Sequence, residues 1–301
     1  MISISKGGST VAATTSGSGD VKAMQALAVC SWSLRPESPQ DLIERVQACG
    51  LSAVQLALTP LVESPAVWGS CGALLRAAGL SIVSGMLETV GEDYSTIERI
   101  AETGGIRPNA TWPATRERAA KAAAVARSLG LRLVTFHAGF LPHDRRDQER
   151  QRMLERLREI AALFAAFGIA VAFETGQEPA PTLVDCLNDL AHPSIGVNFD
   201  PANMLLYGSG DPVAALRLLA PWVRQVHVKD AVASGVAGQW GREVPVGTGQ
   251  VDWPRFLDEV ARCPHQPRLV IEREAGEDRV GDVNIARVAV NRWGSSRVHA
   301  G

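Results

Sequence analysis

The chain has 301 residues, of which 46% are apolar and 21% charged, and its formal net charge is −2. This balance is typical of a globular protein with a sizeable core, and it disfavours a nucleic-acid binder that relies on positive charge. No apolar run approaches the roughly 18 residues of a membrane-spanning helix. The five cysteines show neither a CxxC motif nor a paired spacing, so we expect reduced thiols and a cytoplasmic protein.

The first 25 residues differ in composition from the rest of the chain. They are rich in Ser, Thr, Gly and Ala and carry no periodic apolar pattern. Such a segment cannot bury enough apolar surface to offset its loss of conformational entropy. We therefore expect a disordered tail over residues 1–25, followed by a single domain over residues 26–295.

From residue 26 onward one pattern repeats: a helical stretch ends in Gly, and a short apolar run follows. Gly50, Gly79, Gly130 and Gly168 stand where a helix C-terminus needs a left-handed residue. The apolar runs are continuous, as in parallel strands that are covered on both faces. Eight βα units predict a parallel (β/α)8 TIM barrel, with a doubly wound open sheet as the alternative. The expected strands are residues 26–32, 51–58, 80–86, 131–137, 169–174, 194–199, 222–228 and 267–272.

Four successive strands of this barrel end in a residue that can bind a metal ion: Glu174, Asp200, His227 and Glu272. The carboxyl ends of barrel strands form the active-site face, so these side chains are expected to converge. One of them alone could be a strand-end ion pair or cap, but converging like charges need a cation. Three carboxylates and one imidazole suit one divalent ion of the Mn, Mg or Co type.

The segments that carry these residues resemble one known family. AFETG, NFDPAN, HVKD and VIERE, with GTGQVDW between the last two, are similar to sequences of the xylose isomerase-like barrel superfamily, the sugar phosphate isomerase/epimerase proteins. The resemblance covers residues 26 to 290. It implies that Glu174, Asp200, His227 and Glu272 bind one divalent metal ion. It also implies that Glu174 and Glu272 are an acid/base pair, one on each face of the substrate.

The implied activity is that of an isomerase or epimerase of a keto sugar or related polyol. A metal ion that holds the carbonyl and hydroxyl oxygens stabilises an enediolate, and two carboxylates can remove and return the proton. Return of a proton to the same face of the enediolate gives aldose–ketose isomerisation, and return to the opposite face gives epimerisation. The alternative is a lyase or dehydratase on a keto sugar or keto-inositol, which begins with the same proton abstraction. A non-catalytic sugar-binding barrel is disfavoured because both glutamates are present.

The chain departs from the family at Asn203, where many members have His three residues after the strand-six Asp. Asn is a poor metal ligand and no general base, so a second metal ion is in doubt. We expect Asn203 near the ion but outside its coordination sphere. Apurinic endonucleases of the superfamily use several zinc ions, and Gly241 and Glu243 stand where their additional ligands would fall. A trinuclear phosphodiesterase is therefore disfavoured.

Further side chains are expected on the same face of the barrel, each with a structural alternative such as core packing or an ion pair. The long segment of residues 88–111 after strand three should shape substrate access, and Gln177 and Glu178 are hydroxyl-binding candidates. GTG at residues 247–249 is too weak a signal for a phosphate site. The expected partner is a small sugar or polyol, with no nucleic acid or membrane, and a homo-oligomer stays open. The candidate substrate-binding residues are His137, Asn203, Lys229, Trp32 and Trp240.

Overall fold

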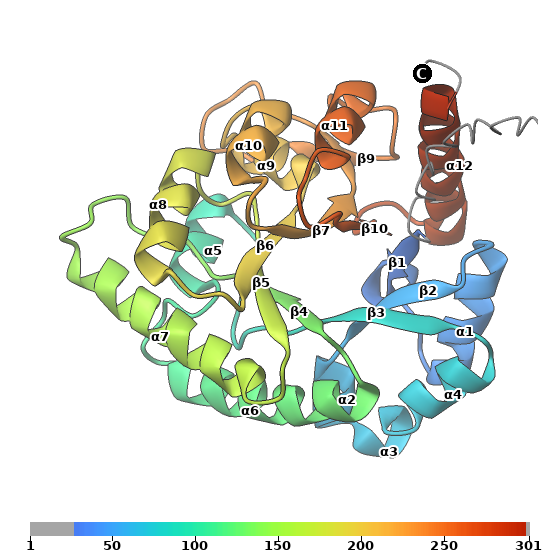
Figure 1. The fold of residues 1–301 in the computed structure, drawn as a ribbon, viewed down its shortest axis with the longest axis horizontal. Coiled ribbons are helices and arrows are strands. Elements are labelled where there is room, and N and C mark those ends of the chain that lie inside the picture. Colours follow the sequence, from blue (N-terminus) through green and yellow to red (C-terminus); the bar gives the residue numbers. More distant parts are fainter. Residues whose placement is uncertain (1–26, 299–301) are drawn as a thin grey trace, which may run out of the picture.

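Eight parallel strands close into a barrel in the order β1-β10-β7-β6-β5-β4-β3-β2 (Figure 1). The computed structural model describes residues 27–298, so the tail expected over residues 1–25 lies outside the described residues. The first and last barrel strands pair with each other, which excludes the open-sheet alternative and confirms the (β/α)8 barrel. The barrel strands are β1 (Ala28–Cys30), β2 (Ala53–Ala57), β3 (Ser81–Met86), β4 (Leu133–Phe136), β5 (Ala170–Glu174), β6 (Ile195–Phe199), β7 (Val223–Val228) and β10 (Arg268–Ile271).

Helices surround the barrel and begin and end at the expected signals. Ser38 caps the first helix by accepting a hydrogen bond from the Asp41 N–H at 3.2 Å. Gly50, with φ of 63°, adopts the left-handed conformation that ends this helix. The helices are α1 (Pro39–Ala48), α2 (Thr59–Glu63), α3 (Pro65–Trp68), α4 (Cys71–Ala77), α5 (Ile97–Thr103), α6 (Trp112–Leu129), α7 (Gln148–Ala165), α8 (Ala180–Leu190), α9 (Pro201–Tyr207), α10 (Pro212–Leu219), α11 (Trp253–Val260) and α12 (Arg279–Val298).

The first strand is shorter than predicted, so Trp32 lies beyond its end. The chain turns at Ser31–Leu34 into a 3-10 helix, η1. The Ser31 hydroxyl accepts the N–H of Ala57, and the Ser33 hydroxyl accepts the N–H of Arg273. The two hydroxyls thus accept backbone N–H groups at the end of β2 and just beyond the end of β10, the two neighbours of β1. A longer β1 would have paired with the backbone at these positions.

A small hairpin that the sequence pattern did not predict follows β7. Strand β8 (Asp230–Val232) pairs antiparallel with β9 (Arg242–Val244). The buried Asp230 carboxylate organises the next loop, because it accepts the N–H groups of Gly247 and Gly249 at 2.9 and 3.2 Å and the indole N–H of Trp253 at 3.0 Å. The GTG segment therefore binds a carboxylate of its own chain.

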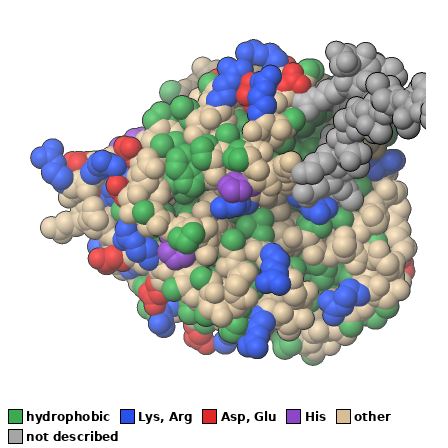
Figure 2. All heavy atoms as spheres, in the orientation of Figure 1, with side chains coloured by type: hydrophobic (Ala, Val, Ile, Leu, Met, Phe, Trp, Pro, Cys, Tyr) green, Lys and Arg blue, Asp and Glu red, His purple; other side chains and the backbone are tan. Residues whose placement is uncertain are grey.

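The main apolar core lies between the strands and the surrounding helices. Inside the barrel, a small apolar cluster of Ala28, Cys30, Ala53 and Val270 accompanies a set of buried polar residues. Figure 2 shows basic side chains scattered among acidic and apolar ones on the face in view, without gathering into one patch. None of the described helices is long and apolar enough to cross a membrane.

Candidate metal centre

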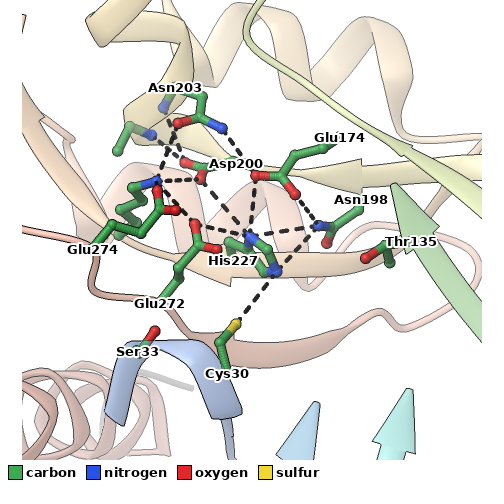
Figure 3. Close-up of polar contacts among 12 residues, drawn as sticks. Cys30, Ser33, Thr135, Glu174, Asn198, Asp200, Asn203, His227, Glu272 and Glu274 are labelled. Carbon is green, nitrogen blue, oxygen red and sulfur yellow. Dashed lines mark hydrogen bonds and ion pairs between the residues drawn. The ribbon is translucent and has the colours of Figure 1, made fainter. Parts of the chain in front are cut away.

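The four predicted ligands converge at the carboxyl end of the barrel (Figure 3). One ligand atom from each of Glu174, Asp200, His227 and Glu272 lies within 4.8 Å of the others. All four side chains are buried, with at most 3% of each residue exposed. Their strands alternate inward and outward, and each of the four occupies an inward position. The geometry that a single divalent ion needs is thus present in the chain.

The two ring nitrogens of His227 face different surroundings. Nδ1 lies 3.4 Å from Oε1 of Glu174 and 3.3 Å from Oε2 of Glu272. Nε2 lies 2.9 Å from Oε1 of Gln55, on the opposite side of the ring. An N–H at Nε2 donates to this amide oxygen, so Nδ1 is the nitrogen that faces the carboxylates and would bind an ion once the ring is neutral.

The orientation of the Gln55 amide follows from its other contacts. Its Nε2 donates to Oγ1 of Thr135 at 2.7 Å and lies 3.5 Å from the carbonyl oxygen of Gly85. A carbonyl oxygen can only accept, so the amide nitrogen faces β3 and β4 and the amide oxygen faces His227. The acceptor for Nε2 is therefore held in place by two further strands.

A buried polar layer below the cluster was missed by sequence analysis. Gln225 donates to the Gln55 oxygen at 2.9 Å and to Oδ1 of Asn198 at 3.2 Å, and the Ser84 hydroxyl donates to Gln225 at 2.6 Å. Asn198 in turn donates to Oε2 of Glu174 at 3.2 Å. A signal was available, because Asn198 and Gln225 are polar residues in apolar strands, two positions before Asp200 and His227. Period-two alternation places such residues on the same inward face.

Lys229 is buried beside the cluster and paired with acids. Its Nζ lies 2.9 Å from Oε2 of Glu272 and 3.7 Å from Oδ2 of Asp200, and it also donates to Glu274. It does not pair with Asp230. Glu274 is a further residue to which sequence analysis assigned no role. It lies two positions after Glu272, so period-two alternation would place it on the same face.

Asn203 lies next to the cluster, as expected. Its Nδ2 donates to Oε1 of Glu174 at 2.9 Å, and its Oδ1 accepts a hydrogen bond from Lys229 at 3.3 Å. Asp200 caps α9, because its Oδ1 accepts the N–H groups of Ala202 and Asn203. Its second oxygen, Oδ2, is buried and accepts no hydrogen bond from the described residues, with Lys229 Nζ at 3.7 Å and His227 Nδ1 at 3.8 Å. Such an orphaned buried carboxylate oxygen suits a cation ligand.

Contacts within the cluster govern its ionisation. Burial favours the neutral carboxyl, but His227 and Lys229 hold the pKa of Glu272 well below its usual range. Burial likewise opposes the charge on His227, but Glu272 above all raises the pKa of the imidazole. Burial raises the pKa of Asp200 against the effect of Lys229. Formally, three carboxylates face two basic side chains, which leaves a negative charge for a further cation.

A pocket of about 490 Å³ opens above the cluster. Trp32 donates to Oε1 of Glu272 at 2.9 Å, and Nε2 of His137 lies 3.9 Å from Oε2 of Glu174, so the pocket reaches the cluster. Four of the five candidate substrate-binding residues line it, whereas Lys229 does not. Among the described residues, the lining consists of Trp32, Ala57, Thr59, Met86, Glu88, Glu92, Tyr94, His137, Asn203, Leu206, Tyr207, Trp240 and Glu274.

The segment after β3 contributes to this pocket, as its length suggested. Glu88, Glu92 and Tyr94 all line the cavity, and Tyr94 packs edge-on against His137 with ring centroids 6.1 Å apart. Tyr207 was not singled out by sequence analysis, and its ring lies 4.6 Å from that of Trp240. Tyr207 shares α9 with Asn203, four residues away, which helical periodicity places on the same side of the helix.

Glu243 of β9 and Glu178 of the loop after β5 have structural partners. Glu243 accepts hydrogen bonds from Arg273 at 2.6 Å and from the N–H of Glu274 at 3.0 Å, so it holds the segment that follows β10. Glu178 accepts the N–H of Leu141 at 2.8 Å, and neither it nor Gln177 lines the pocket.

Glu178 provides a prediction about stability. Burial raises the pKa of Glu178 to about 7 from 4.5, against the opposing effect of the Leu141 N–H. Because the folded-state pKa lies above the unfolded value, the stability from its neutral form is lost as pH rises from about 4.5 through 7. Glu178→Gln is expected to be more stable than the wild type at pH 8, by about 3 kcal/mol, and nearly equal to it at pH 4.5.

Urea unfolding of the chelator-treated proteins at both pH values measures this difference. Glu155→Gln makes the same change on the exposed face of α7 and should alter stability at neither pH. A Glu178→Gln variant whose advantage is the same at pH 4.5 and pH 8 would contradict the argument.

Known proteins resemble this chain in both sequence and structure. Residues 43–288 match the family model described as xylose isomerase-like TIM barrel. A 3-dehydroshikimate dehydratase of Bacillus anthracis is 28% identical over 134 residues, which are 39% of this chain and 48% of that protein. The match thus spans about half the length of this curated relative.

Two solved structures extend the comparison. The xylose isomerase domain protein of Planctomyces limnophilus is 31% identical with a TM-score of 0.78, over 85% of this chain and 92% of that one. The D-psicose 3-epimerase of Clostridium cellulolyticum is 15% identical with a TM-score of 0.62, over 91% and 98%, which is a likeness of fold. The family match covers most of the barrel. The chain therefore belongs to the xylose isomerase-like TIM barrel family.

Proposed function

We propose that the chain is a divalent-metal-dependent isomerase or epimerase of a keto sugar or related polyol. One observation carries the proposal: Glu174, Asp200, His227 and Glu272 lie within ligand distance of one another at the end of a pocket. The oxygen-rich donor set and the orphaned Oδ2 of Asp200 fit a Mn, Mg or Co ion. When bound, such an ion supplies a Lewis acid that stabilises negative charge on the oxygen atoms of a ketose.

The chain's own residues would then move the proton. Glu174 and Glu272 lie 3.4 and 3.3 Å from Nδ1 of His227, and both also contact pocket-lining residues. Oε1 of Glu174 accepts a hydrogen bond from Asn203 and its Oε2 lies 3.9 Å from His137, whereas Oε1 of Glu272 accepts from Trp32. One carboxylate removes the proton beside the carbonyl, and the other, protonated from solvent, donates its own proton to the enediolate carbon. Asn203, His137, Trp32 and Trp240 would contact the substrate from the pocket walls, and Lys229 would hold Glu272 and Glu274 in place.

A lyase or dehydratase is the second candidate, and the similarity to a dehydratase favours it. Both reactions begin with removal of the same proton, so they share the glutamate pair. They differ in the fate of the enediolate, which either takes the proton back or expels a neighbouring hydroxyl group.

The test is incubation of the chain with free ketoses and keto-inositols in D2O with added Mn²⁺, Mg²⁺ or Co²⁺. Isomerisation or epimerisation is expected to place deuterium on the substrate carbon and to retain the substrate's oxygen atoms, whereas dehydration lowers the product mass by one water. Chelator-treated protein is the control and should show no exchange. Absence of deuterium uptake across the panel with every metal would rule out the proposed reaction.

A further inference from the structure

The described walls of the pocket carry three acidic side chains and a single basic one, the imidazole of His137, which lies 3.9 Å from Oε2 of Glu174 and packs edge-on against Tyr94. Glu88, Glu92 and Glu274 line the cavity, and no Lys or Arg is among its described lining residues. Lys229 is the nearest Lys below the pocket, but it is only 1% exposed and already bound to Glu272 and Glu274. A divalent ion together with Lys229 would balance the three carboxylates of the cluster. The wall carboxylates would remain uncompensated, so the pocket repels anions.

Two sets of backbone amides that could hold an anion already have acceptors within the chain. Barrels commonly bind phosphate in the loops after strands seven and eight, but here Gly247 and Gly249 donate to Asp230. The first amides of α9 donate to Asp200. Arg273, beside the cluster, lies 2.6 Å from Glu243 and 2.7 Å from Asp282, and both partners are acids.

The rest of the wall suits an uncharged polyol. Trp32, Tyr94, Tyr207 and Trp240 offer ring surfaces on which the C–H face of a sugar can pack. The indole Nε1 of Trp240 is buried and has no hydrogen-bond partner among the described residues. It is thus free to donate to a substrate oxygen, while Glu88 and Glu92 can accept from substrate hydroxyls.

We propose that the substrate of this pocket is a polyhydroxylated carbonyl compound that carries neither a phosphate nor a carboxylate. The inference rests on the proposed function and narrows its substrates to uncharged compounds. It separates this chain's substrate from sugar phosphates and from keto acids, because an anionic substituent would lie against three wall carboxylates, with no Lys or Arg among the described lining residues to bind it.

Saturation-transfer NMR with the Mg²⁺-loaded chain tests the inference through binding alone. The probes are fructose, psicose, tagatose, sorbose and a keto-inositol, each of the four ketoses compared with its own 6-phosphate and the keto-inositol with a keto acid of similar size. We expect the uncharged probes to bind at least about tenfold more tightly than their anionic counterparts. This difference in affinity should become smaller at high salt, which screens the repulsion between charges. Equal or tighter binding of the phosphates would overturn the inference, and so would a panel in which no uncharged probe binds.

A charge reversal at the wall sharpens the test. Glu88 is exposed, and its carboxylate forms no hydrogen bond with the described residues. Glu88→Lys is therefore expected to reduce the affinity difference between a ketose and its phosphate several-fold. Glu155→Lys makes the same charge change on the outer face of α7 and should leave this difference unchanged. An equal effect of both variants would show that net charge, rather than the pocket wall, sets the preference.

The two failures are distinguishable by combining binding with deuterium exchange. Uncharged probes that bind but never exchange would refute the proposed reaction and leave the inference of an uncharged substrate standing. Ketose phosphates that bind and exchange would refute that inference and leave the proposed reaction standing.

Discussion

Replacing either Glu174 or Glu272 by glutamine is expected to lower turnover at least about a hundredfold. Glutamine keeps the shape of the side chain and one oxygen atom, but it cannot accept a proton. Glu174 and Glu272 lie 3.4 and 3.3 Å from Nδ1 of His227, and the two carboxylates approach it from different sides (Figure 3). Because one carboxylate removes a proton and the other donates one, each single change should be sufficient to stop the reaction.

The measurement is the rate of product formation from whichever ketose the chain converts, together with deuterium uptake from solvent. Glu178→Gln is a matched control, because Glu178 follows the same strand and is buried but does not line the pocket. It should retain normal turnover. Near-normal rates in both Glu174→Gln and Glu272→Gln would show that proton transfer occurs elsewhere.

Replacing Gln55 by leucine is expected to weaken Mn²⁺ binding about 10- to 100-fold. In the wild type, the Gln55 oxygen lies 2.9 Å from Nε2 of His227 and accepts its N–H, which leaves Nδ1 as the nitrogen available to a metal ion beside the candidate ligand carboxylates. Leucine removes this acceptor, so the imidazole loses its preferred tautomer and orientation. Titration calorimetry measures the affinity, and ¹⁵N shifts of His227 in the Mg²⁺-loaded chain report which nitrogen is protonated.

Two variants separate this orienting role from a general loss of packing. Gln55→Glu retains an oxygen acceptor and is expected to restore most of the affinity. Thr135→Val removes only a partner of the Gln55 amide nitrogen and should have a smaller effect. Unchanged Mn²⁺ affinity in a folded Gln55→Leu variant would contradict the role of Gln55, as would a wild-type His227 that is protonated at Nδ1.

Local patterns along the chain sufficed for the barrel and for the convergence of the four candidate ligands. Glycines such as Gly130 and Gly168 adopt the left-handed conformation at helix ends, with φ of 74° and 69°. The ligands were found because parallel strands all end on the same face, so a strand-end position predicts convergence without any knowledge of distances. The sequence placed Trp32 in the first strand, whereas it lies in the 3-10 helix that follows. This turn is held by the Ser31 and Ser33 hydroxyls, and an apolar pattern does not reveal such contacts.

The supporting network needed the folded chain. Gln55 and His227 are 172 residues apart, and Gln55 and Gln225 are 170 apart, yet each pair is hydrogen-bonded across the barrel interior. From the sequence, Lys229 could face the pocket or pair with an acid. Its distances to Glu272 and Asp200 in the folded chain show that it pairs with acids. The wall acids Glu88 and Glu92 belong to a long segment whose course depends on contacts with distant residues.

The sequence by itself determined the (β/α)8 fold and which four side chains meet at its carboxyl face, because helix ends, strand ends and side-chain alternation are set by neighbouring residues. The tertiary structure alone decided which nitrogen of His227 faces the carboxylates, which acids hold Lys229, and the acidic, aromatic character of the pocket wall. Those features arise from contacts between strands and loops far apart in the chain, and no local pattern encodes the distance between them.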